Sequence, residues 1–135
     1  MFASKRSKPQ SRIDCLIGVG TVVEGNILFT GGLRIDGKVK GNVMAAGEQP
    51  GTLVLSEQAR VDGEIHVSHA VINGAVAGPV HAAEYLELQP KAHVTGDVHY
   101  SALEVRLGAV VEGRLVHGSA GKAEKVVQLK PASAD

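Results

Sequence analysis

A thirteen-residue unit recurs along this chain, and the repeat constrains the fold more than any other feature does. The unit is clearest in LVLSEQARVDGEI, residues 53–65. Its full-length copies are 15–27, 53–65, 86–98 and 103–115, and a shorter eleven-residue form occupies 33–43 and 70–80. Successive units therefore begin 18, 20, 17, 16 and 17 residues apart. A period of this length indicates a solenoid in which each unit forms one layer.

Apolar alternation within each unit predicts short strands. Leu53 and Leu55 are two residues apart, as are Ala59 and Val61, and Ile65 follows four residues later. A spacing of two indicates a strand, and a spacing of four leaves room for a corner. Stacked units bury these side chains, and six coils at about 4.8 Å would make a rod roughly 29 Å long. We therefore predict an all-β, single-domain parallel β-helix of about six triangular coils over residues 13–117.

Glycine placement and composition support this fold over a helical one. Apolar residues do not recur at helical spacing between residues 15 and 115, and each interior glycine would cost a helix about 1 kcal/mol. Most repeat glycines follow an inward aliphatic residue, where a strand must turn in little space. With two Phe, two Tyr and no Trp, the predicted core consists of thin aliphatic layers.

Charge is distributed unevenly between the predicted rod and its flanks. Residues 1–12 carry four basic side chains and no acidic one, whereas 13–117 hold seven Lys or Arg against twelve Asp or Glu. Because neither flank shows apolar periodicity, we predict a disordered arm at 1–12 and a flexible tail at 118–135. A further loop is predicted at 45–52. No segment matches a transmembrane span or a secretory signal, which predicts a cytoplasmic protein.

Catalytic and nucleotide-binding patterns are absent from the sequence. No Ser-His-Asp or Cys-His arrangement is recognisable, and no glycine-rich loop leads into a helix. An acidic body with few aromatic residues does not favour nucleic acid. We therefore expect no enzymatic activity, cofactor, nucleotide or nucleic-acid partner. The single cysteine, Cys15, occupies the repeat position of Leu53 and is predicted to be buried.

Three histidines occupy equivalent repeat positions. His66, His81 and His99 each follow the last aliphatic residue of a unit. On adjacent coils these side chains would stack about 4.8 Å apart. Such a ladder presents ligands that a divalent metal uses, and the sequence leaves open whether it binds one.

The first and last units have no neighbour within the chain. Without capping helices, their strand edges and aliphatic side chains would be exposed, which favours docking of another copy and a filament. Like or unlike ends could meet. The residues predicted to form this polymer interface are Ile17, Val19, Val23, Leu103, Val105, Leu107, Val111 and Leu115.

These repeats resemble the bactofilins, a family of bacterial cytoskeletal proteins. The resemblance rests on units such as 23–27 (VEGNI) and 33–43 (LRIDGKVKGNV) and extends over about 13–117. It implies a right-handed β-helix that polymerises through its ends without nucleotide into non-polar filaments. It also implies a scaffold for cell-wall synthesis or remodelling proteins.

The N-terminal arm resembles the membrane-targeting peptide of some bactofilins. The residues that carry this resemblance are Met1, Phe2, Lys5, Arg6 and Lys8. Each basic residue contributes about 1 kcal/mol on an anionic surface, and a filament would array many arms, so that weak contacts add up to firm attachment. The resemblance implies a peripheral location on the inner face of the cytoplasmic membrane, bound to anionic lipid.

A left-handed hexapeptide β-helix, as in trimeric acyltransferases, is the alternative interpretation. Leu53, Ala59 and Ile65 are six residues apart, as that fold requires. The steps of 20, 17 and 16 residues are not multiples of six, however, and no insertion loop carries an isolated catalytic histidine.

Overall fold

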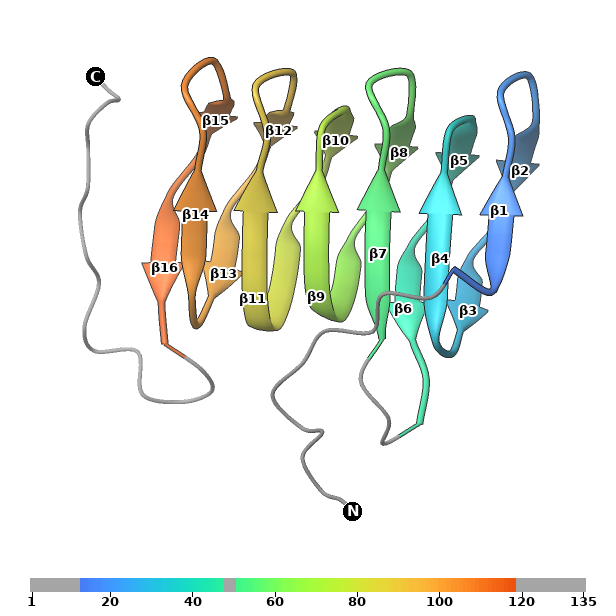
Figure 1. Cartoon of the computed structure of the whole chain (residues 1–135), viewed down its shortest axis with the longest axis horizontal. Helices are drawn as coiled ribbons and strands as arrows, with labels where there is room; N and C mark the ends of the chain where they lie inside the picture. The colour runs from blue at the N-terminus through green and yellow to red at the C-terminus, as the bar shows by residue number, and fades with distance from the viewer. Residues whose placement is uncertain (1–12, 48–50, 119–135) are drawn as a thin grey trace.

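The rod consists of six stacked coils built only from β-strands (Figure 1). The computed structural model describes residues 13–47 and 51–118. Every strand pair in these ranges is parallel, so each interior coil hydrogen-bonds to the coil before it and the coil after it. The predicted all-β parallel solenoid of about six coils is confirmed. The predicted arm at 1–12, residues 119–135 of the predicted tail and loop residues 48–50 lie outside the described residues.

Three faces run along the rod, each with one strand segment per coil. The first face contains β1 (Cys15–Ile17), β4 (Gly32–Ile35), β7 (Thr52–Leu55), the second halves of β9 (Ile65–Ile72) and β11 (Val80–Leu88), and β14 (Leu103–Val105). The second contains β2 (Val22–Glu24), β5 (Lys38–Lys40), β8 (Arg60–Asp62), β10 (Ala75–Ala77), β12 (His93–Thr95) and β15 (Val110–Glu112). The third contains β3 (Ile27–Phe29), β6 (Val43–Ala45), the first halves of β9 and β11, β13 (Val98–Tyr100) and β16 (Leu115–His117).

The core is a column of aliphatic side chains inside the rod. Leu53, Leu55, Val61 and Ile65 have no exposed surface, and Ala59 is 3% exposed. These are the inward positions that the apolar alternation predicts. Equivalent residues stack in register, so each core layer packs on the layers above and below. Burial of apolar surface at about 25 cal/mol per Å² stabilises the stack.

The two unit lengths differ at the corner between the first and second faces. Four residues separate β7 from β8, whereas two residues, Asn73 and Gly74, separate β9 from β10. Figure 1 shows the short corners at β4–β5 and β9–β10 below the longer corners beside them. The preceding long corner folds over Gly74, where an added Cβ would overlap the carbonyl oxygens of Ser56 and Ala59. Glycine is therefore required by close backbone approach.

Two strands are longer than the repeat predicts. β9 and β11 each continue from the third face onto the first, and β11 shifts register relative to β9 between Ala82 and Tyr85. The apolar alternation marks inward positions on both sides of this corner but does not show whether backbone pairing continues around it. The loop predicted at 45–52 is shorter at both ends, because Ala45 belongs to β6 and Thr52 to β7. Ala46, Gly47 and Gly51 lie outside the strands.

The prediction that Cys15 is buried is wrong. Cys15 does pair in register with Leu33, as its repeat position requires. The residue is nevertheless exposed. The first coil has a neighbouring coil on one side only, so a core position there remains uncovered.

Candidate assembly surfaces at the two ends of the rod

Both ends of the rod present open strand edges. At the N-terminal end β1, β2 and β3 pair only with β4, β5 and β6 of the second coil. At the C-terminal end β14, β15 and β16 pair only with strands of the fifth coil. No helix or further strand of the described part of the chain covers either edge. Unpaired backbone groups on such an edge can pair with another chain.

The N-terminal end exposes half of a core layer. Ile17 and Val23 are partly buried and pack on the core from one side. Val19, in the corner between β1 and β2, is 67% exposed. These three predicted residues lie together on the first coil. A layer placed against this end would complete the burial of Ile17 and Val23.

The C-terminal end likewise exposes one side of the last core layer, which no further coil among the described residues covers. Leu103, Val111 and Leu115 are partly buried against the core, whereas Val105 is 50% exposed. Leu107 lies in the long corner between β14 and β15 and is 95% exposed. The structure thus brings together five of the predicted interface residues here. It separates them from the other three by the four interior coils.

Further apolar residues of the end coils were missed by the sequence analysis. Ile27 and Ala109 also pack on the core from one side, and Leu16 and Leu28 are 58% and 67% exposed. Ile27 has the same repeat position as Leu115, so the repeat alignment contains the signal for it. Leu16 and Leu28 occupy outward positions on their strands, where the repeat gives no signal for an interface. Only their place on the first coil marks them as part of the end of the rod.

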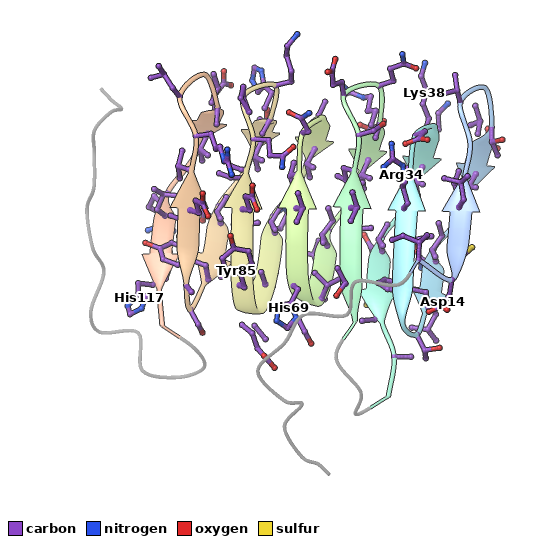
Figure 2. The ribbon with its side chains drawn as sticks, in the orientation of Figure 1. Asp14, Arg34, Lys38, His69, Tyr85 and His117 are labelled. Atoms are coloured by element: carbon purple, nitrogen blue, oxygen red, sulfur yellow. The ribbon has the colours of Figure 1, made fainter. Side chains whose placement is uncertain are left out.

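A polar network on the first face ties the last coil to the fifth. The Tyr85 hydroxyl donates to Glu104 Oε1 at 2.9 Å, and Arg106 Nη2 lies 3.3 Å from both Glu104 Oε2 and Glu87 Oε2. Burial, followed by the hydrogen bond to Glu104, raises the pKa of Tyr85 to about 12. Figure 2 shows Tyr85 near the corner where β11 turns onto the first face. The repeat alignment contains a signal for this network, because it places Glu87 and Glu104 side by side on adjacent coils, where a nearby cation such as Arg106 is favourable.

The three aligned histidines form a stacked ladder on the third face. The ring centroids of His66 and His81 are 4.3 Å apart, and those of His81 and His99 are 4.4 Å apart. The predicted stacking is therefore confirmed. Within residues 13–47 and 51–118, no group of three or more His, Cys, Asp or Glu side chains is arranged to hold a metal ion.

The predicted membrane-binding residues lie outside the described part of the chain. They are Met1, Phe2, Lys5, Arg6 and Lys8. Among the residues that the structure describes, no helix is both long and apolar enough to cross a membrane.

The geometry defines a class of protein, a short parallel β-solenoid with an open layer at each end. A family described as "Bactofilin: Polymer-forming cytoskeletal" matches residues 15–116. The chain therefore belongs to the bactofilin family of cytoskeletal structural proteins. This assignment confirms the resemblance seen in the repeats and favours it over the hexapeptide acyltransferase interpretation.

One curated relative is Bactofilin BacP of Myxococcus xanthus (strain DK1622). It is 24% identical over 119 residues, which make up 87% of this chain and 48% of the relative. The chain thus spans about half the length of that protein. No solved structure matches the chain significantly.

Proposed function

We propose that this chain assembles end to end into cytoskeletal filaments without a nucleotide. The observation that carries the proposal is the incomplete core layer at each end, where strand edges and half-covered aliphatic side chains coincide. A second copy placed on either end supplies the missing half-layer and pairs the backbone. These contacts are of the same kind as those between interior coils, which form on folding. That similarity supports assembly without nucleotide hydrolysis.

A charge placed in the last coil tests this assembly. Leu107→Arg would place a cation in the junction between two copies, where an unpaired charge is strongly unfavourable. Because Leu107 is 95% exposed, the substitution leaves the core of the monomer intact. We expect electron microscopy and sedimentation without nucleotide to show filaments of the wild type and short species of the variant. Val105→Arg should act in the same way.

Glu57→Arg is the matched control. Glu57 occupies the equivalent corner position in the third coil and is exposed there. It lies between interior coils, away from both ends, so this variant should form wild-type filaments. Wild-type filaments from both Leu107→Arg and Val105→Arg would refute a role for the C-terminal coil in assembly.

The filament is proposed to lie on the inner face of the cytoplasmic membrane. The proposal rests on Met1, Phe2 and the basic residues Lys5, Arg6 and Lys8. Many arms on one polymer multiply a weak lipid contact. Phe2→Ala should abolish co-sedimentation with anionic vesicles while leaving filaments intact. Ala3→Ser is the matched control and should retain binding. Unchanged binding of Phe2→Ala would refute the role of the arm.

We further propose that the filament acts as a scaffold for proteins of cell-wall synthesis or remodelling. The support is the family assignment together with three outward faces that repeat along a polymer. Cross-linking in cells should recover such proteins with wild-type filaments and fewer of them with Leu107→Arg. Equal recovery with both would show that assembly is not needed for recruitment.

A further inference from the structure

The histidine ladder, His66, His81 and His99, is half-buried on the third face and spans coils 3 to 5. The three side chains project from β9, β11 and β13 on the third face, at positions paired in register. The ring planes are 9° and 10° from parallel, with centroids 4.3 and 4.4 Å apart. His81 is therefore held between two other imidazoles.

Two of the three ladder histidines have a carboxylate two residues before them, and the middle one does not. Glu64 precedes His66 by two residues, and its Oε1 lies 3.0 Å from His66 Nε2. Asp97 precedes His99 by two residues, and its pKa is lowered mainly by Arg114, with a smaller contribution from His99. The equivalent position before His81 is Pro79. His81 thus lacks the counter-charge that the outer two histidines have in their own coils.

Other groups along this column are apolar. Met44 of β6 pairs with His66, and Val116 of β16 pairs with His99. Burial lowers the pKa of His81, and the neighbouring imidazoles of His66 and His99 lower it further, while Glu64 acts in the opposite direction. A proton on His81 therefore has no carboxylate two residues before it in its own coil, and an imidazole lies within 4.4 Å on each side.

We propose that the ladder is a pH-responsive element of the rod: its rings stack while His81 is neutral, and protonation of His81 separates them and loosens coils 3 to 5. Once His81 and a neighbouring ring both carry a proton, two like charges lie about 4 Å apart and repel strongly when partly shielded from water. The protonated rings can relieve that repulsion by turning outward, which removes the ring contacts between neighbouring coils. This inference does not depend on end-to-end assembly or on the membrane arm.

A titration of all histidine side chains by nuclear magnetic resonance tests the first half of the proposal. We expect the midpoint of His81 to lie below 6.5, the ordinary value for an imidazole. Pro79→Asp would place a carboxylate two residues before His81, as in the adjacent coils, and should raise that midpoint. A His81 midpoint at or above 6.5 would overturn the proposal.

Amide hydrogen exchange as a function of pH tests the second half. In the wild type, exchange in β9, β11 and β13, expressed relative to the intrinsic rate of an unprotected amide at the same pH, should accelerate as the pH falls through the His81 midpoint. His81→Phe keeps a stacked ring without the proton and should remove this acceleration, whereas His93→Gln should preserve it. If His81→Phe does not fold, Pro79→Asp replaces it and should move the onset of acceleration to higher pH. Acceleration that is unchanged in the variant used would overturn the proposal.

Discussion

Asp97 holds the last coil through two contacts with Arg114. Asp97 Oδ1 accepts the backbone N–H of Arg114 at 3.1 Å, and Oδ2 accepts from its guanidinium at 3.1 Å. Asn26 and Asn42 make the first of these contacts in earlier coils, each accepting the N–H of the equivalent residue in the next coil. The C-terminal end surface is therefore fixed by the same corner contact that joins interior coils.

Asp97→Ala should loosen the last coil, whereas Asp97→Asn should largely preserve it. Alanine removes both contacts and should cost about 0.5–1.5 kcal/mol. Asparagine keeps the backbone acceptor and loses only an exposed ion pair, worth less than about 1 kcal/mol. Amide exchange at Arg114 measures the difference. Equal exchange in the two variants would show that the carboxylate contributes through charge alone.

The stability that Asp97 contributes should depend on pH in a defined direction. The side-chain and backbone hydrogen bonds from Arg114 lower the pKa of Asp97. A carboxyl whose pKa is lowered on folding stabilises the protein above the unfolded pKa of about 3.9, and this stability is lost as the pH falls through the folded value. The exchange difference between wild type and Asp97→Asn should therefore be largest near neutral pH. A constant difference down to strong acid would contradict this assignment.

Gly74→Ala should destabilise the rod more than any exposed glycine substitution. The new Cβ would overlap the carbonyl oxygens of Ser56 and Ala59. Overpacking of this kind costs about 1–3 kcal/mol or more. Gly18→Ala is the matched control, because an added Cβ there meets nothing within 4 Å. Urea unfolding of both variants measures the contrast, and equal midpoints would contradict the close approach at Gly74.

Leu55→Ala and Leu107→Ala should separate folding from assembly. Leu55 is fully buried and Leu107 is 95% exposed. Truncation of a buried leucine costs about 2–5 kcal/mol because it leaves a cavity. We expect Leu55→Ala to lower the free energy of unfolding and Leu107→Ala to leave it unchanged while weakening filaments. Loss of stability in both would mean that Leu107 packs within its own monomer.

Repeat periodicity predicted well which side chains point inward, because stacked coils must place equivalent residues on the same side of the chain. The inward positions of the third unit and the His66–His81 stack both follow from the alignment of units. Whether an inward side chain is buried is a different question, because burial also requires a neighbouring coil on each side. Cys15 is exposed because the first coil has a neighbour on one side only. The network of Tyr85 with Glu104 was also missed. It joins residues that are 19 apart in the sequence, and only the register of adjacent coils brings them together.

Tyr85 should keep its proton well above the pH at which a free tyrosine ionises. Burial and the hydrogen bond to Glu104 raise its pKa to about 12, and burial also raises that of Tyr100, the only other tyrosine. Ultraviolet absorbance should therefore show little phenolate near pH 10, where a free tyrosine is about half ionised.

The contribution of Tyr85 to the free energy of unfolding should depend on pH in the alkaline range. Since the folded pKa is raised, this contribution is fully present below about pH 10 and is lost as the pH rises toward about 12. Tyr85→Phe should reduce this alkaline loss and cost about 1 kcal/mol at neutral pH through the lost hydrogen bond. Tyr100→Phe is the control and should leave the Tyr85 contribution in place, whereas ionisation of Tyr85 near pH 10 in that variant would refute its link to Glu104.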